Sequence, residues 1–135
     1  ILKGIMDNED AIIASKIGAD AIIVSNHGGR QLDGAPSSIS VLSGIVESVK
    51  GKIEVHFDGG VRSGQDVLRA LCLGASGVYI GRPYIYGLGA AGEEGVSKSI
   101  EIIKKELDLT MALCGEKSIS NLGKHNIANN PHGHG

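Results

Sequence analysis

The fold is decided by two stretches that share one pattern, Lys16-Ile-Gly-Ala-Asp-Ala-Ile-Ile-Val-Ser25 and Cys72-Leu-Gly-Ala-Ser-Gly-Val-Tyr-Ile-Gly81. Each stretch leaves a helical pattern through a glycine turn, forms a short apolar run and ends in a polar loop. Strands this apolar, connected by helices, are typical of a parallel sheet that helices cover. The repeated pattern therefore predicts successive βα units along one sheet.

The same alternation extends over most of the chain. The expected strands are Ile1–Ile5, Ala21–Ser25, Ile53–Phe57 and Gly77–Ile80, and the expected helices cover residues 8–17, 38–49, 64–73 and 93–113. Asp7 and Ser63 have the positions of N-caps, and a glycine follows each helical pattern. About four such βα units make half of a (β/α)8 TIM barrel, whose usual length is about 250 residues.

We therefore predict an α/β fold that is the C-terminal half of a (β/α)8 barrel over residues 1–115. The chain starts inside a strand, which favours the half-barrel over the alternative, a small open α/β sheet. Residues 116–135 are polar and weakly periodic. They are expected to form a partly disordered C-terminal tail, with a short helix over residues 118–122.

The composition argues against several kinds of partner and location. The 135 residues carry a net charge of -2, which gives no electrostatic basis for binding nucleic acid or an anionic membrane surface. No apolar run approaches the roughly 18 residues of a membrane span, and neither a signal peptide nor a Ser-Lys-Leu ending is evident. With only two cysteines, Cys72 and Cys114, a reduced, cytoplasmic location is expected.

The first candidate site follows the second expected strand, at Ser25-Asn-His-Gly-Gly-Arg-Gln-Leu-Asp33. Functional residues of parallel barrels lie at the carboxyl ends of the strands, where this stretch begins. If the strand stayed extended, Ser25 and His27 would share one face. His27 can accept a proton near neutral pH, and Arg30 can bind a carboxylate with two hydrogen bonds. A base beside such an arginine is what oxidation of a 2-hydroxy acid requires; the alternative for His27 is a structural role.

Two further candidate sites follow the third and fourth expected strands, at Asp58-Gly-Gly-Val-Arg-Ser-Gly64 and at Gly81-Arg82. Backbone N–H groups at glycine turns and helix N-termini bind phosphate, and arginines add charge-assisted hydrogen bonds. Phosphate sites of barrels use the loops after strands seven and eight, which these loops would be in a C-terminal half. The alternative is that Asp58 caps the following helix while Arg62 and Arg82 are solvated.

Other polar side chains carry weaker indications. Lys3 lies in an apolar strand, so it either reaches the end of the strand or faces an anionic ligand. His56 shares the face of Asp58, and a hydrogen-bonded structural histidine inside the barrel is expected. No zinc-type spacing predicts a metal site, and a tail is the favoured interpretation of the segment with His132 and His134. No pattern separates a site from packing for the three tyrosines, Tyr79, Tyr84 and Tyr86.

The stretch Ser25–Asp33 resembles the active-site signature of the FMN-dependent 2-hydroxy-acid dehydrogenases, the family of glycolate oxidase, lactate oxidase and the lactate and mandelate dehydrogenases. The resemblance covers nearly the whole chain before the tail, through Asp58–Arg62, Ala70–Ala75, Ile80–Pro83 and Leu109–Leu113. The Asp-Gly-Gly-Val-Arg and Gly-Arg pair also occurs in other phosphate-binding barrels, such as inosine monophosphate dehydrogenase. The longer stretch is narrower, and it carries the identification.

The resemblance implies FMN as the cofactor and oxidation of an (S)-2-hydroxy acid to a 2-oxo acid. It implies that His27 takes a proton from the substrate while two electrons go to flavin N5, and that Arg30 holds the substrate carboxylate. Lys3 would lie near flavin N1 and O2, and Ser25 would touch the isoalloxazine. The ribityl phosphate would be held by the two glycine-arginine loops, through Asp58, Gly59, Gly60, Arg62, Gly81 and Arg82. A homo-oligomeric, tetramer-like parent is also implied.

Two alternative functions stay open from the sequence. One is another phosphate-recognising barrel enzyme, similar to inosine monophosphate dehydrogenase. The other is a non-catalytic half-barrel that assembles with a complementary chain or with itself. In the family that the chain resembles, an aspartate partner of the histidine and tyrosines near the substrate lie upstream of the matched part. The isolated fragment is therefore expected to be inactive, because its base lacks the group that orients it.

Overall fold

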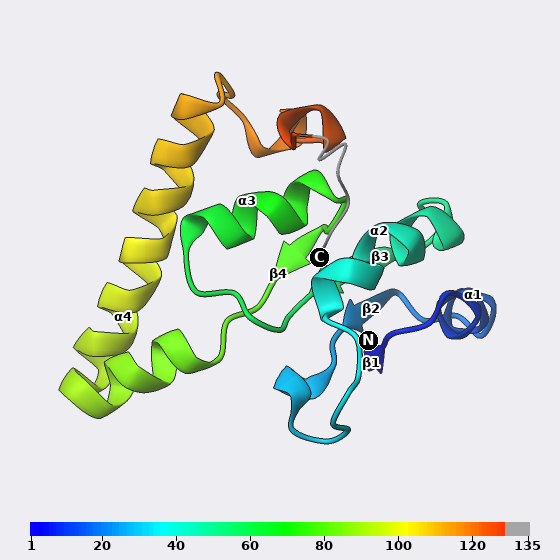
Figure 1. Cartoon of the computed structure of the whole chain (residues 1–135). Coiled ribbons are helices and arrows are strands. Elements are labelled where there is room, and N and C mark those ends of the chain that lie inside the picture. Colours follow the sequence, from blue (N-terminus) through cyan, green and yellow to red (C-terminus); the bar gives the residue numbers. More distant parts are fainter. Residues whose placement is uncertain (129–135) are drawn as a thin grey trace.

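Parallel strands form the centre of the computed structural model, which describes residues 1–128. They are hydrogen-bonded in sequential order (Figure 1): β1 (Leu2–Ile5), β2 (Ala21–Val24), β3 (Glu54–Phe57) and β4 (Gly77–Val78). Sequential order is that of a barrel wall, whereas a doubly wound sheet reverses its strand order at a switch point. The arrangement matches the α/β half-barrel expected from the sequence, with a shorter fourth strand than predicted.

Three helices connect the strands: α1 (Asn8–Lys16), α2 (Ser38–Val49) and α3 (Gly64–Cys72). The ends of each helix lie within one residue of the predicted bounds. Both predicted N-caps are confirmed. The carboxylate of Asp7 accepts a hydrogen bond from the N–H of Glu9 at 2.7 Å. The hydroxyl of Ser63 accepts one from the N–H of Asp66 at 3.2 Å. Each cap satisfies a donor that the first turn of a helix leaves free.

The two faces of the sheet carry different side chains. The face that packs against the helices is apolar. Its side chains Ile22, Val24, Val55 and Phe57 share a core with helix residues, and all of them are at most 3 % exposed; the helix residues are Ala14, Leu42, Ile45 and Ala70. Burial of each larger side chain in this core contributes about 1.5–3 kcal/mol of hydrophobic stabilisation. The opposite face has Lys3, Ile23 and His56 side by side in one register row. In a closed barrel this opposite face is the interior.

The last helix, α4 (Arg82–Leu113), begins earlier than predicted. The sequence predicted a helix from residue 93, but the helical run already starts at Arg82. The backbone leaves helical geometry at Ala91 (φ -152°, ψ 27°) and Gly92 (φ 58°, ψ -138°), so α4 consists of two segments that meet at a bend (Figure 1). Glycine is a poor helix former, by about 1 kcal/mol relative to alanine, and the glycines of the first segment made it look like a loop.

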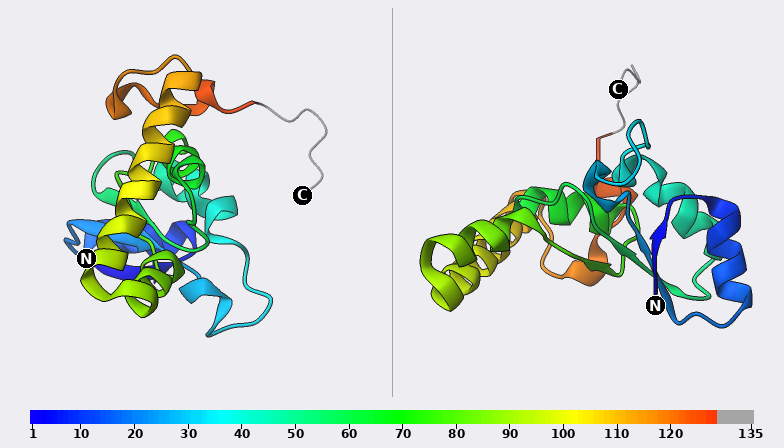
Figure 2. Two further views of the ribbon diagram at one scale, coloured as in Figure 1. Left: turned by 90° about the vertical axis from the view of Figure 1, so that its left-hand side faces the viewer. Right: turned by 90° about the horizontal axis from the view of Figure 1, so that it is seen from below.

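Two glycines explain why the bend of α4 is possible. The segments cross with Gly87 against Gly95, where an added Cβ would meet backbone atoms of the other segment. The second segment then runs along α3, and α4 and α1 lie at opposite ends of the molecule (Figure 2). The absence of side chains at the crossing therefore lets α4 fold back on itself.

The segment after α4 packs on the outer side of α3 through residue 128. The predicted helix over residues 118–122 is a 3-10 turn at Ile119–Asn121, and a second turn covers Lys124–Asn126. Its residues Leu122 and Ile127 contact a small apolar core made by α3 and α4. The helix residues of this core are Leu68, Cys72, Leu107 and Met111. Desolvation by these neighbours raises the pKa of the Cys72 thiol. His132 and His134 lie outside the described residues.

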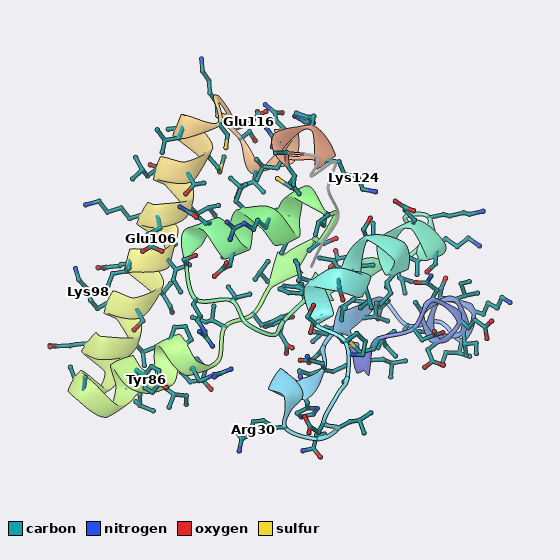
Figure 3. All side chains as sticks on the ribbon, viewed as in Figure 1. Arg30, Tyr86, Lys98, Glu106, Glu116 and Lys124 are labelled. Carbon is teal, nitrogen blue, oxygen red and sulfur yellow. The ribbon has the colours of Figure 1, made fainter. Side chains whose placement is uncertain are left out.

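Polar contacts fasten this C-terminal segment at two points (Figure 3). Glu116 accepts hydrogen bonds from Asn126 at 3.0 Å and from His125 at 3.3 Å, which lower the pKa of its carboxyl. Lys124 forms an ion pair with Glu47 of α2, and this hydrogen bond lowers the pKa of Glu47. The pair of Lys124 and Glu47 is largely exposed, so its contribution to the binding of the segment is small.

Within residues 1–128, no helix combines the length and the hydrophobicity that a bilayer crossing requires.

Gly95→Ala is expected to destabilise the crossing of the two α4 segments. An ideal Cβ at Gly95 would lie 1.9 Å from the carbonyl oxygen of Gly87, so the segments would have to move apart. We expect a loss of about 2 kcal/mol or more in the free energy of unfolding, measured by urea denaturation.

Gly89→Ala is the matched control, because no atom lies within 4 Å of a Cβ at this helical position. It should be neutral or stabilising by up to about 1 kcal/mol, since alanine is the better helix former. Equal effects of the two substitutions would contradict the close crossing.

Candidate active site

A cavity of about 530 Å³ opens at the carboxyl ends of the strands. This is the edge at which parallel barrels carry their active sites, and the volume is within the roughly 300–1,000 Å³ of ligand pockets. Nine of the ten residues predicted for the site line it: Lys3, His27, Arg30, Asp58, Gly59, Gly60, Arg62, Gly81 and Arg82. The tenth, Ser25, is 2 % exposed and lies outside the lining. The sheet therefore gathers loops that are far apart in the sequence.

A tight turn after β2 places His27 in the cavity wall. The strand ends at Val24, and His27 has a left-handed backbone with φ 58°. The expected common strand face for Ser25 and His27 is therefore wrong. Asn26 stabilises the turn, since its N–H donates to Ser38 Oγ at 3.1 Å and its side-chain oxygen accepts from the N–H of Gly28 at 3.0 Å. A left-handed residue other than glycine costs about 1–2 kcal/mol, a kind of strain that clusters at functional sites.

Lys3 is held by partners from two other strands. Its ammonium group donates to Ser25 Oγ at 3.0 Å and forms an ion pair with Asp58 Oδ2 at 3.0 Å. Ser25 Oγ also accepts the N–H of His27 at 3.1 Å. Lys3 thus reaches the end of its strand, and the anion that it faces is the carboxylate of Asp58. Because Asp58 pairs with Lys3 while Ser63 caps α3, the alternative in which Asp58 is the cap is wrong.

Two backbone stretches of the cavity wall can receive an anion. Gly59 and Gly60 have φ angles of 103° and 86°, and within residues 1–128 their N–H groups donate to no other backbone group. α4 begins at Arg82 without a side-chain N-cap, and Pro83 has no N–H, so the N–H groups of Arg82 and Tyr84 are the open donors of its first turn. Arg62 and Arg82 line the same cavity. This is the donor set that binds phosphate in proteins.

The beginning of α3 does not belong to this donor set. The N–H of Arg62 donates to Asp66 Oδ2 at 3.1 Å, and the N–H of Gly64 donates to Glu106 Oε2 of α4 at 2.9 Å (Figure 3). Ser63 supplies the N-cap. Of the two helix N-termini beside the predicted phosphate loops, only that of α4 is therefore free for a ligand.

The charge of the cavity wall favours an anionic ligand. Its lining includes four basic side chains, Lys3, Arg30, Arg62 and Arg82, against the single carboxylate of Asp58. Arg30 lies on the exposed loop after β2, and its side chain extends away from the sheet (Figure 3). Clustered charge of one sign in a concave wall raises the local concentration of oppositely charged ligands.

Two tyrosines of the cavity were not predicted. Tyr79 and Tyr84 both line it, although their sequence pattern did not separate a site from packing. The rule of carboxyl strand ends could have singled out Tyr79, which directly follows β4. His56 is hydrogen-bonded to the hydroxyl of Tyr79 and to Glu54, as expected of an interior histidine. Within residues 1–128, no three acidic, histidine or cysteine side chains form a metal cluster.

Comparison with known proteins gives the family of the chain. A family model described as FMN-dependent dehydrogenase matches residues 1–129. The chain belongs to the FMN-dependent dehydrogenase family. This match agrees with the resemblance of the stretch Ser25–Asp33, and it does not favour the alternative of a barrel similar to inosine monophosphate dehydrogenase.

Relatives and solved structures of this FMN-dependent dehydrogenase family agree with the match. The chain is 53% identical over 127 residues to peroxisomal (S)-2-hydroxyacid oxidase GLO3 of Arabidopsis thaliana, covering 94% of the chain and 35% of the relative. It is 53% identical over 131 residues to 2-hydroxyacid oxidase 1 of Mus musculus, covering 97% and 35%. The crystal structure of mandelate oxidase with (S)-4-hydroxymandelic acid superposes with a TM-score of 0.86 at 51% identity, covering 88% of the chain and 34% of that structure. The chain thus spans about a third of the length of the relatives it matches.

The cavity of this family member is suited to FMN. A flavin phosphate is a dianion, and the cavity offers open backbone N–H groups at Gly59, Gly60 and the start of α4, with Arg62 and Arg82 also in its lining. The glycines leave room for close approach because neither carries a side chain. A mandelate oxidase variant with a monooxide FMN adduct is among the matching structures.

Gly59→Ala is expected to disturb the contact between the loops after β2 and β3. An ideal Cβ at Gly59 would lie 2.6 Å from Ser38 Oγ, the group that receives the N–H of Asn26. The same residue has φ 103°, so alanine adds backbone strain as well. We expect a drop in the thermal unfolding midpoint that exceeds the drop caused by Gly60→Ala.

Gly60→Ala is the control that adds the backbone strain without the steric clash with Ser38. Gly60 has a similar φ of 86°, but no atom lies within 4 Å of its Cβ position. It should lose only the roughly 1–2 kcal/mol of a left-handed alanine. If both variants unfolded at the same temperature, the loops would not be in the described contact.

Proposed function

We propose that this chain is the part of an FMN-dependent enzyme that carries the catalytic base and the flavin phosphate site, and that the enzyme oxidises an (S)-2-hydroxy acid to a 2-oxo acid. One observation carries the proposal: His27 and Arg30 line the same cavity as the two phosphate-type loops. A base, a carboxylate-binding arginine and an anion site within one cavity are what such a reaction requires. Both 2-hydroxyacid oxidases described above, from plant and mouse, fit this assignment.

His27 is proposed to take the proton of the substrate hydroxyl. His27 lines the cavity on a turn that Ser25 and Asn26 hold in place. Arg30 is proposed to bind the substrate carboxylate with two parallel hydrogen bonds. FMN, when bound, would accept the hydrogen of the substrate C–H bond together with its two electrons, which leaves the 2-oxo acid. The other side chains then hold the cofactor and balance its charge.

The charge of each side chain decides which part of the cofactor we propose it to bind. Gly59, Gly60, Arg62, Gly81 and Arg82 are proposed to bind the FMN phosphate. Lys3 is proposed to lie near the flavin ring, where an ammonium stabilises the anionic reduced form. Asp58 is better suited to be the counter-ion of Lys3, since the two form an ion pair and a carboxylate repels phosphate.

Ser25 is proposed to act on the site through its neighbours. Its oxygen accepts hydrogen bonds from the Lys3 ammonium and the His27 N–H, and it is 2 % exposed. A hydroxyl in this place fixes the base relative to the ammonium. The contact with the isoalloxazine that the sequence resemblance implied stays a prediction.

Turnover is proposed to need more protein than this chain contains. Within residues 1–128, no carboxylate is hydrogen-bonded to the His27 ring, and an oriented base needs such a partner. The interior face of the sheet is also only partly covered, since Lys3 is exposed and Ile23 and His56 are half-buried. We assign residues 1–115 to the barrel half and residues 116–135 to a C-terminal segment.

The expected assembly and location stay predictions. The tetramer-like oligomer comes from the family resemblance alone. The cytoplasmic location was inferred from sequence signals, and the Arabidopsis relative is itself named peroxisomal.

His27→Gln is expected to abolish turnover in the complete enzyme while FMN binding is retained. Glutamine preserves the size and polarity of the side chain but cannot accept the substrate proton, and a general base contributes about 10²–10⁴-fold to rate. The measurement is the anaerobic bleaching of the flavin absorbance by glycolate, lactate or mandelate.

His125→Gln provides the comparison, because His125 lies on the C-terminal segment and outside the cavity. It should bleach at the rate of the unaltered protein. Normal bleaching by His27→Gln would refute the assignment of the base.

A further inference from the structure

Three hydrogen-bonded side chains cross the interior face of the sheet and reach the cavity. Glu54 Oε2 lies 2.9 Å from His56 Nε2, and His56 Nδ1 lies 2.9 Å from the hydroxyl of Tyr79. Glu54 and His56 belong to β3, and Tyr79 follows β4. Since Tyr79 lines the cavity, this chain of contacts connects the first residue of β3 with the candidate active site.

The carboxylate of Glu54 determines the direction of both hydrogen bonds. An ionised carboxylate can only accept, so His56 carries its proton on Nε2. In the neutral imidazole Nδ1 is then an acceptor, and the hydroxyl of Tyr79 donates to it. A carboxylate that fixes the tautomer of a histidine in this way also fixes how the histidine binds a third group.

Packing holds the imidazole of His56 in one place. Its side chain is 15% exposed, and it lies over Gly77 of β4, where an ideal Cβ would be 3.5 Å from three of its ring atoms. The rings of His56 and Tyr79 have their centroids 5.7 Å apart at an interplanar angle of 38°. A side chain larger than a methyl group at position 77 would displace the ring. The small residue on β4 therefore permits the position of His56 on β3.

Tyr79 marks the point where the chain leaves the sheet for the Gly81-Arg82 loop. Its N–H donates to the carbonyl of Phe57 at 2.9 Å, and β4 has only two register pairs with β3. In the part of the chain that the structure describes, the N–H groups of Ile80 and Gly81 donate to no other backbone group. The hydrogen bond from Tyr79 to His56 is therefore a second hydrogen bond at the base of this loop, besides the packing of Ile80 against the core.

We propose that Glu54 and His56 are positioning residues that act through Tyr79 to fix the Gly81-Arg82 loop for a phosphate group. The inference rests on the proposed function, since the phosphate considered is that of FMN. Riboflavin has the same ring system and ribityl chain but no phosphate. A defect in the attachment must therefore weaken the binding of FMN and spare that of riboflavin.

Titration of the complete apoprotein with FMN and with riboflavin, followed by flavin fluorescence, tests the proposal. Tyr79→Phe removes the hydroxyl and keeps the ring. It should weaken FMN binding about three- to tenfold, the effect of one hydrogen bond, and leave riboflavin binding unchanged. His56→Leu should have the same effect. His56→Asn can place an amide oxygen near the position of Nδ1, so it should recover part of the FMN affinity.

Tyr86→Phe is the matched control, because Tyr86 lies on α4 with 70% of its surface exposed (Figure 3). It should change the binding of neither ligand. Equal weakening of FMN and riboflavin by Tyr79→Phe would overturn the inference, and so would an unchanged FMN affinity; in both cases the proposed function would stand. An unaltered protein that does not bind FMN would overturn the proposed function and the inference together.

Discussion

The ion pair between Lys3 and Asp58, with Ser25 between them, is the interaction on which the candidate site depends. It joins the strand ends of β1, β2 and β3 at distances of 3.0 Å. The pair is partly exposed, with side-chain exposures of 42% and 19%, so its contribution to stability is modest. Its importance is geometric, because the same hydroxyl of Ser25 also holds the N–H of His27. The ammonium, the base and the counter-ion therefore keep fixed positions relative to one another.

The helix-covered face of the sheet stabilises the fold, and the strand ends carry the candidate site. Apolar side chains of β2 and β3 pack against α1, α2 and α3, and this core makes the sheet rigid. The carboxyl ends of the strands can then carry groups that are unfavourable elsewhere: a left-handed histidine, open N–H groups and four basic side chains in one cavity. Such strained and charged groups persist only where the surrounding structure holds them.

Much of the fold and of the site followed from local patterns. The four strands and three crossover helices were predictable because apolar period, caps and glycine stops agreed with each other. The first segment of α4 was missed because Gly87 and Gly89 lower helix propensity, and the contact of Gly87 with the second segment is not visible in sequence. Tyr79 was missed for a similar reason: its partners, His56 and Glu54, are more than twenty residues away.

The sequence alone determined the residue types at each strand end, the family signature around His27 and the two glycine-arginine loops, because each of these is a contiguous stretch. Only the tertiary structure decided how the groups are paired. Asp58 pairs with Lys3 and does not cap a helix. Glu106 accepts the N–H of Gly64 at the start of α3, whereas the start of α4 has no side-chain cap. The physical reason is that parallel register brings together strand ends that are tens of residues apart. Which charged group then meets which is set by this register and by helix packing, and a local pattern contains neither.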